Sequence, residues 1–420
     1  MAVRWAYPSS AGPAVTRSCS TSRSCFSPSA RASSMTVNGT IEIHGDCEPG
    51  FVAVRDSLAR NFSEHDEIGS AVAVYQDGEK VVDIWGGHMD SARSRLWRED
   101  TLCIMYSIAK SMCATALHIL ADRRQVDLDA PVATYWPEFA QNGKDAVLVR
   151  HIISHNCGVC FADATAAGDI YDYDRMIAAL EVQEPAWPAG SRGAYNTVNI
   201  GYLAGEVVRR VTGTPIRDFI HQNICRPLGA DYQIGVNADD VARIADLEPN
   251  PAGSAMAAQA SNGETPLSRA WRPNPNPMNT DTQNSLEFRT AGIPSFGGFG
   301  EARAMARIYA MLANGGEIDG TRILSREAVA RATETQWTEA ADGMTGRAMR
   351  YAMGYAKNPP GGTAMGPNEN AFGHLGSGGA RAIADPDRNR ALCFVSNLHS
   401  EGFGVGARTE AIVDATFSVA

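Results

Sequence analysis

Two pairs of β-strand signals lie near opposite ends of this chain, and they constrain its fold more than any other feature. The first pair covers residues 70–75 and 80–85, two apolar, β-branched runs joined by a turn that contains glycine. The second pair covers residues 379–384 and 391–397, joined by an Asp-Pro-Asp turn. Between them, residues 126–290 show mostly helical periodicity. This order predicts an antiparallel sheet assembled from both chain ends and interrupted by a helical insertion.

The remaining segments complete the prediction of an α+β fold with helices flanking the sheet. Helices are expected at residues 108–124, 200–211, 216–225, 301–313 and 409–419. We expect residues 36–125 and 291–420 to form one α/β domain around the central antiparallel sheet, and residues 126–290 to form a mostly helical domain. Residues 246–290, rich in Asn, Pro, Gly and Ser, predict a long loop over a cleft. A site is expected where the two domains meet.

Residues 1–35 differ in composition from the rest of the chain. The first 34 residues contain four arginines and many serines but no acidic residue, and they lack the apolar centre of a secretory signal. Two interpretations stay open: a transit segment for an organelle, or an over-long start with true initiation at Met35. In either case we expect this leader to be disordered and to lie outside the fold.

Charge and composition exclude several classes of partner. The net charge of −10 argues against a nucleic-acid-binding surface, which needs clustered cations to neutralise phosphates. No run approaches 18 apolar residues, so no membrane span is expected. The nine cysteines are scattered and odd in number, which indicates buried thiols in a reducing compartment rather than a disulfide framework. We therefore expect a cytoplasmic protein, with import into an organelle through residues 1–34 as the alternative.

The chemistry of the chain is suggested first by Ser107 and Lys110, which lie three residues apart where a predicted helix begins. Such residues lie on one side of a helix, and an amine with a lowered pKa can take the proton of a serine hydroxyl. The helix N-terminus would also stabilise a developing oxyanion. Of the four lysines, only Lys110 follows a serine at this spacing. On these two residues alone, an exposed pair on a helix surface is an equally good interpretation.

Two further motifs give the sequence its resemblance to a known family. The Ser107–Lys110 segment, the segment Pro188–Tyr195 and the segment His374–Ser377 occur in the order and at the separation of the Ser-x-x-Lys, tyrosine and His-x-Gly motifs of that family. The sequence resembles the serine β-lactamase and penicillin-binding-protein superfamily, in particular the class C-like family VIII carboxylesterases. The resemblance extends from about residue 50 to residue 420 and implies a β-lactamase/transpeptidase-like fold.

The resemblance also implies a role for each matched residue. Ser107 is the expected nucleophile, and Lys110 and Tyr195 the expected base pair, in which a nearby ammonium stabilises a phenolate. The backbone N–H groups of Ser107 and Ser377 would form the oxyanion hole, with Gly376 beside it. His374 would hydrogen-bond either the tyrosine or the substrate. His374 stands where many relatives have lysine, so one fixed positive charge for a substrate carboxylate is missing. The expected reaction is therefore hydrolysis of a small, neutral carboxylic ester through an acyl-serine.

Three alternatives to an esterase remain at this stage. The same nucleophile would serve an acyltransferase or a hydrolase of β-lactams or amides, and a non-catalytic binding protein of this fold is the third. A metal site at His151, His155, Cys157 and Cys160 is disfavoured because these side chains are too close in sequence for the usual loop between ligand pairs. The sequence thus predicts neither a metal nor a cofactor.

Overall fold

The computed structural model describes residues 41–276, 278–404 and 406–419. The leader expected at residues 1–35 lies outside the described residues. Within the described ranges, no helix has both the length and the apolar character that crossing a membrane requires. The seven cysteines in the described part of the chain are all free thiols.

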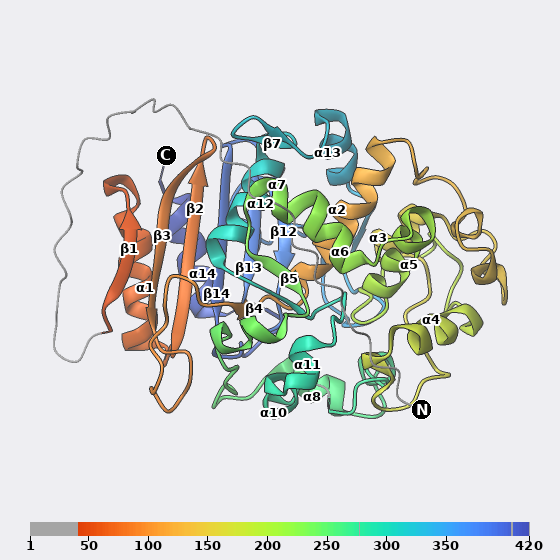
Figure 1. The fold of residues 1–420 in the computed structure, drawn as a ribbon, viewed down its shortest axis with the longest axis horizontal. Helices are drawn as coiled ribbons and strands as arrows, with labels where there is room; N and C mark the ends of the chain where they lie inside the picture. The colour runs from red at the N-terminus through yellow and green to blue at the C-terminus, as the bar shows by residue number, and fades with distance from the viewer. Residues whose placement is uncertain (1–40, 277, 405, 420) are drawn as a thin grey trace, which may run out of the picture. The chain divides into compact units, whose positions relative to one another are not determined.

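A nine-stranded antiparallel sheet forms the centre of the fold (Figure 1). Its strands follow the spatial order β1-β3-β2-β14-β13-β12-β11-β10-β9, so β2 and β14, from opposite ends of the chain, lie next to each other. The expected α+β fold and both predicted hairpins, β2/β3 and β13/β14, are confirmed. The strands are β1 (Ile43–Cys47), β2 (Gly69–Gln76), β3 (Glu79–Gly87), β9 (Trp337–Glu339), β10 (Met349–Tyr351), β11 (Ala356–Lys357), β12 (Phe372–Leu375), β13 (Arg381–Asp385) and β14 (Arg390–Ser396).

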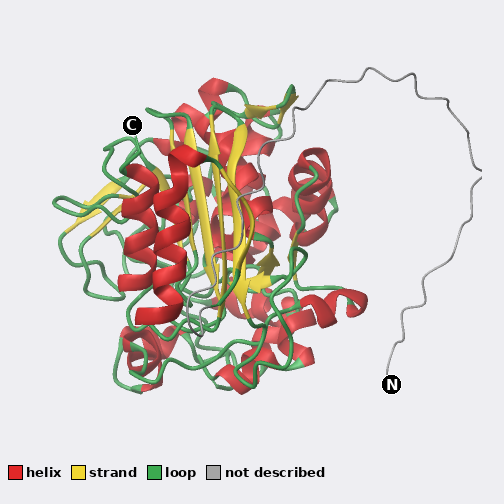
Figure 2. Cartoon of the chain, turned by 90° about the vertical axis from the view of Figure 1, so that its left-hand side faces the viewer, coloured by secondary structure: helices red, strands yellow, loops and turns green. Residues whose placement is uncertain are grey.

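Helices cover both faces of this sheet (Figure 2). Because strand side chains alternate between faces, Val72 and Val74 of β2 pack with α1 (Val52–Glu64) and α14 (Ala407–Phe417) in one cluster. Ala73 and Tyr75 belong to the cluster on the opposite face, where α12 (Ala302–Ala313) packs on β2, β13 and β14. Both faces of the central strands are therefore buried, which explains their nearly continuous apolar sequence.

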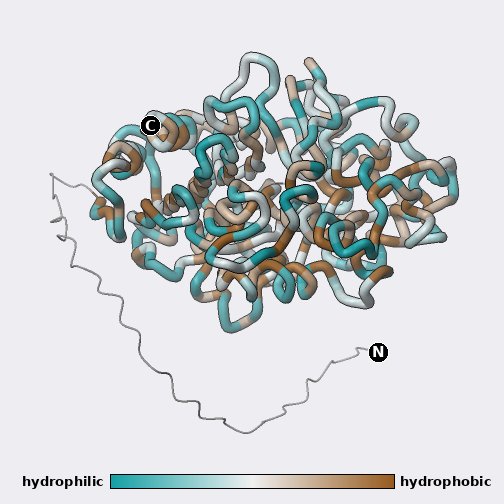
Figure 3. Tube along the Cα trace, turned by 90° about the horizontal axis from the view of Figure 1, so that it is seen from above, coloured by the Kyte–Doolittle hydropathy of each residue, from teal (hydrophilic) through white to brown (hydrophobic). Residues whose placement is uncertain are grey.

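Helix α2 (Ile108–Asp122) lies in the interior, and every residue from Ile108 to Leu120 is buried. A helix that is buried on all sides needs other elements to surround it. Here α5, α6, α13 and β12 do so. Hydrophobic segments run through the interior of the trace, and many peripheral loops are hydrophilic (Figure 3). The other helices with a place in this part of the fold are α3 (Val149–Ile153), α4 (Tyr173–Val182), α5 (Ile200–Thr212), α6 (Ile216–Ile220), α7 (Arg226–Leu228) and α13 (Arg326–Thr333).

The structure corrects the expectation of a long loop at residues 246–290. The segment contains four short helices: α8 (Ala255–Ser261), α9 (Pro266–Ala270), α10 (Thr280–Asn284) and α11 (Leu286–Thr290). Each begins after a side chain that accepts a backbone N–H, namely Ser254, Thr265, Asn279 and Ser285. Four of the polar residues in this segment are therefore helix N-caps.

Two small sheets complete the fold. The strands β4 (Cys103–Ile104), β6 (Gly298–Gly300) and β5 (Tyr232–Ile234) form the first, with β6 in the middle. The glycine-rich stretch at residues 295–300 therefore ends in a strand. The second is a hairpin of β7 (Glu317–Ile318) and β8 (Thr321–Arg322).

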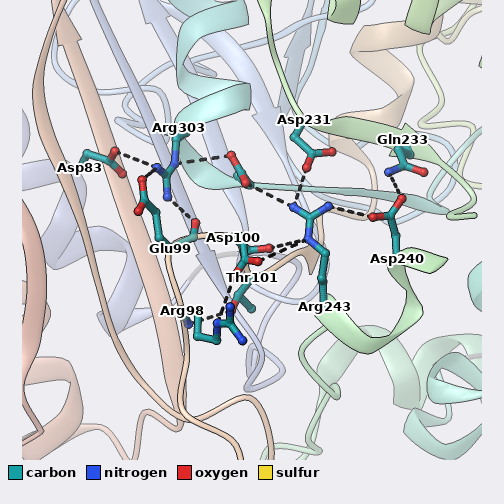
Figure 4. A network of polar contacts seen from close by, with 11 residues as sticks. Asp83, Arg98, Glu99, Asp100, Thr101, Asp231, Gln233, Asp240, Arg243 and Arg303 are labelled. Atoms are coloured by element: carbon teal, nitrogen blue, oxygen red, sulfur yellow. Dashed lines mark hydrogen bonds and ion pairs between the residues drawn. The ribbon is translucent and has the colours of Figure 1, made fainter.

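A network of ion pairs joins segments from both halves of the sequence (Figure 4). Arg243 contacts Asp231 at 2.6 Å and Asp240 at 2.8 Å. Glu301, which precedes α12, lies 3.5 Å from Arg243 and 3.4 Å from Arg303 and so connects the two guanidinium groups. Burial raises the pKa of Glu301 to about 7, although Arg303 acts in the opposite direction. The network thus holds a carboxyl group whose ionisation the fold disfavours.

Candidate active site

Ser107 and Lys110 meet at the start of α2. The side chain of Lys110 extends back along the first turn, and its Nζ lies 2.9 Å from Ser107 Oγ and 2.9 Å from the carbonyl oxygen of Ser295. Lys110 is only 1% exposed. Burial lowers its pKa to about 7, because an apolar surrounding disfavours the ammonium form. A substantial share of Lys110 is therefore an uncharged amine near neutral pH.

The backbone immediately before Ser107 adopts an unusual conformation. Tyr106 has a φ of +47°, in the left-handed region that non-glycine residues seldom occupy. Its hydroxyl donates a hydrogen bond to Gln283 Oε1 at 2.9 Å. Gly378 lies so close to the Tyr106 ring that a Cβ there would approach Cε2 to 2.3 Å. Tight packing therefore holds the turn that presents Ser107.

Tyr195 reaches Ser107 from the connection between α4 and α5. Its backbone N–H donates to Asp342 Oδ1 at 2.9 Å, and Lys110 Nζ lies 5.4 Å from the centre of its ring. Burial raises the pKa of Tyr195 above its ordinary value, and a hydrogen bond with Ser107 opposes that effect only in part. Tyr195 is therefore a neutral phenol in the resting site.

Two buried histidines surround the tyrosine. His155 lies 4.8 Å and His374 6.1 Å from the Tyr195 ring, centre to centre. Burial lowers the pKa of His374 to about 3 and that of His155 far below its ordinary value, so both rings are neutral. His374 Nδ1 donates to the carbonyl of Leu375 at 2.9 Å, which makes Nε2 an acceptor. No described residue gives this buried Nε2 a hydrogen bond.

Two backbone N–H groups are available for an oxyanion. Those of Ser107 and Ser377 donate to no other residue in the described ranges. The turn after β12 is fixed by hydrogen bonds from the Gly376 N–H to the Ala380 carbonyl at 2.7 Å and from Ser400 Oγ to the Ser377 carbonyl at 2.6 Å. Fixed donors of this kind are what a tetrahedral intermediate needs.

A small cavity of about 50 Å³ opens onto these groups. Of the residues predicted from the sequence, Ser107, Tyr195, His374 and Ser377 line it, and Lys110 lies behind Ser107. Met256 of α8 contributes to the wall, so the segment expected to cover a cleft does reach the cavity. The other lining residues are Thr197, Thr345, Arg347, Met349, Tyr351, Leu375 and Phe403.

Several residues of the site were not found from the sequence. Ser295 accepts a hydrogen bond from Lys110 through its carbonyl, and its Oγ accepts one from the Gly201 N–H at 2.8 Å. Asp342 holds the backbone of Tyr195, and Tyr351 packs 5.8 Å from its ring. None of these lies in a local pattern that indicates chemistry. Their partners lie between 94 and 185 residues away in sequence.

The two histidines of the disfavoured metal site each use a ring nitrogen to accept a backbone N–H. His151 Nδ1 accepts the backbone N–H of Leu148 at 3.2 Å, and His155 Nδ1 accepts that of Asn196 at 2.9 Å. Across residues 41–276, 278–404 and 406–419, no group of three or more His, Cys, Asp or Glu side chains is arranged to hold a metal ion.

The antiparallel sheet, the helices on both of its faces and the buried serine, lysine and tyrosine define the class of this protein. They are the features of a serine hydrolase with a β-lactamase/transpeptidase-like fold. The Beta-lactamase family model matches residues 55–417, and the chain belongs to this family.

Individual relatives agree with this assignment. The Esterase/beta-lactamase LipL of Mycobacterium tuberculosis is 33% identical over 361 residues, which cover 84% of this chain and 83% of that protein. The crystal structure of a family VIII carboxylesterase superposes on this chain with a TM-score of 0.83 and 35% sequence identity. The match covers 90% of this chain and 100% of the carboxylesterase chain. A penicillin-binding protein homologue from Caulobacter crescentus covers the same shares, with 33% identity and a TM-score of 0.80.

Proposed function

We propose that this protein hydrolyses carboxylic esters through an acyl-Ser107 intermediate. One observation carries the proposal: Lys110 Nζ, with its pKa lowered to about 7 by burial, lies 2.9 Å from Ser107 Oγ. A serine hydroxyl needs a base within hydrogen-bond reach, and an amine that is uncharged at neutral pH is such a base.

The roles of lysine and tyrosine follow from their pKa values. Lys110 takes the proton of Ser107 as Oγ attacks the ester carbonyl, and the N–H groups of Ser107 and Ser377 stabilise the oxyanion. Tyr195 then gives its phenolic proton to the departing alkoxide oxygen and regains one from Lys110. Burial keeps Tyr195 protonated in the resting site, so the phenolate of the expected Lys110/Tyr195 pair forms only in this second step. Water releases the acid from Ser107 through the same groups in reverse.

An ester fits the site better than an amide. The names of two relatives, an esterase/β-lactamase and a family VIII carboxylesterase, point to ester chemistry. An ester also has the better leaving group, which demands less of a site whose buried histidines are neutral and whose tyrosine has a raised pKa. β-Lactam opening and acyl transfer would pass through the same acyl-serine. The test therefore has to distinguish each of them from ester hydrolysis.

The test compares 4-nitrophenyl butyrate with nitrocefin. We expect the wild-type protein to hydrolyse the butyrate and the Ser107→Ala variant to lose that turnover. Ser111→Ala is the matched control, since Ser111 lies one turn later on α2, is also buried, and its hydroxyl bonds to the Ile108 carbonyl and the Tyr309 hydroxyl. A fluorophosphonate adduct found on Ser107 by mass spectrometry would identify the nucleophile directly.

The outcomes separate the alternatives. Turnover of nitrocefin alone would favour β-lactam hydrolysis, and ester formation with an added alcohol would favour acyl transfer. Ester turnover that survives in Ser107→Ala, or the absence of both turnover and adduct, would refute the proposal.

A further inference from the structure

A single arginine places a positive charge at the cavity that contains Ser107. Arg347 lies in the connection between β9 and β10 and is one of the lining residues. Its guanidinium carbon is 5.0 Å from the centre of the Phe403 ring, and its charge acts on Tyr351. Both aromatic residues line the same cavity, so the cationic end of this half-buried arginine lies at the cavity.

This guanidinium has no internal counter-ion. In the part of the chain that the structure describes, it forms neither an ion pair nor a hydrogen bond. The carboxylate nearest in sequence, Asp342, is already occupied by the backbone N–H groups of Tyr195, Met344 and Thr345. By contrast Arg350, three residues further on, pairs with Glu369 at 3.3 Å.

The remaining groups of the cavity do not compensate the charge. No carboxylate is found among its described lining residues. His374 is neutral, and Lys110 lies behind Ser107 and directs its Nζ to Ser107 and the Ser295 carbonyl. The cavity therefore combines one fixed positive charge with otherwise neutral walls, and it lies open to a ligand that brings one negative charge.

We propose that Arg347 binds a carboxylate of the substrate, so that the preferred substrates are esters that carry a free carboxylate. This inference rests on the proposed esterase function and names its substrate class. A guanidinium presents paired N–H donors that match the two oxygens of a carboxylate. One cation next to a small cavity suits a carboxylate better than a phosphate dianion, whose second charge would stay uncompensated.

Arg347 supplies the fixed charge that His374 does not. The loss of the motif lysine suggested that no fixed charge meets the substrate, and hence that the ester is neutral. In the folded chain the charge comes instead from Arg347, a residue outside the three motifs. Arg347 is a specificity-determining residue in this proposal, and it takes no part in the chemical step.

The experiment compares ester pairs that differ in one carboxylate. Mono-4-nitrophenyl glutarate is compared with 4-nitrophenyl valerate, and 4-carboxyphenyl butyrate with phenyl butyrate, each corrected for hydrolysis without enzyme. In Arg347→Gln, we expect the ratio of kcat/KM for the charged ester to that for the neutral ester to fall about tenfold in at least one pair. Arg347→Lys should keep part of the preference for the charged ester, because lysine keeps the positive charge but lacks the paired N–H donors of the guanidinium.

Arg350→Gln is the matched control, because this arginine belongs to the same region but pairs with Glu369 outside the cavity. It should leave both ratios unchanged. Calorimetry with monomethyl glutarate on the Ser107→Ala protein gives a second readout that needs no turnover. We expect the Kd to rise about tenfold when Arg347→Gln is added.

The failures are distinguishable. If the wild-type protein shows no ester turnover that depends on Ser107, the esterase proposal is refuted. The calorimetric result by itself would then decide whether Arg347 binds a carboxylate. Unchanged ratios in both ester pairs, together with an unchanged Kd, would overturn the inference.

Discussion

At the scale of single residues, Lys110 shows how position in the fold changes the chemistry of a side chain. The same residue type is exposed and paired at Lys80, whose Nζ lies 2.6 Å from Asp83. Lys110 has no such carboxylate partner in the described structure, and burial has lowered its pKa to about 7. A base with a pKa near the working pH transfers protons most effectively.

This difference predicts a pH profile. Below pH 7 Lys110 is protonated and cannot accept the proton of Ser107, so kcat/KM for 4-nitrophenyl butyrate should fall about tenfold per pH unit and should level off above pH 7. Ser111→Ala should show the same profile. Lys110→Met should lower kcat/KM by roughly 10³-fold and remove the inflection. An inflection near the ordinary pKa of lysine would contradict this assignment.

The sequence predicted Ser107 and Lys110 because their relation is local, three positions on one helix. Tyr195 and His374 were found only through motifs, since no local pattern connects them with Ser107. Asp342 and Arg347 were not found, because each acquires its role from contacts made across the fold. An arginine in a polar loop looks the same in sequence whether its guanidinium meets solvent, a carboxylate or an active site.

At the scale of elements, the turn between β12 and β13 determines where the Ser377 N–H, the second oxyanion donor of the proposed mechanism, lies. A Cβ at Gly376 would approach the Met105 carbonyl to 2.7 Å, and one at Gly378 would overlap the Tyr106 ring. Glycine at these two positions is what lets the end of β12 approach the start of α2.

We expect Gly376→Ala to separate these elements and to lower kcat/KM for butyrate esters at least tenfold, since one lost oxyanion donor costs about 10²–10³-fold. The melting temperature should fall as well, because the clash is with backbone. Gly263→Ala is the control, as a Cβ there meets no atom within 4 Å and the residue is exposed. Equal activity in the two variants would show that the close approach has no role in catalysis.

Elements with strong periodicity were predicted well, and short ones were not. The strands of both hairpins and the helices α2, α5, α12 and α14 have the expected type and nearly the expected bounds. The helices α8 to α11 are five to seven residues long, too short to show an apolar repeat. Their N-cap residues were the available signal, and the same residue types are common in loops.

At the scale of the whole molecule, the ion-pair network around Arg243 and Arg303 joins the region before α2 to β5 and α12. Glu301 is its titratable member near neutral pH. The folded chain keeps the proton of Glu301 up to about pH 7, whereas the unfolded chain releases it near 4.5. Stability should therefore fall as the pH rises through this window.

Glu301→Gln removes this titration. We expect the difference in melting temperature, wild type minus Glu301→Gln, to become smaller or more negative as the pH is raised from 5 to 8. Glu369→Gln serves as the control, because Glu369 is 80% exposed and pairs only with Arg350 among the described residues. A pH-independent difference between the wild type and Glu301→Gln would show that Glu301 ionises normally in the fold.

The neighbouring position of β2 and β14 has a consequence for biosynthesis. Ser70 lies opposite Ser396, so the middle of the sheet stays open until more than three hundred further residues have left the ribosome. During translation the segment that includes Ser107 is therefore made well before β14 and Ser377. Nascent chains should consequently acquire reactivity only near completion, and chaperones have an exposed sheet edge to protect until then.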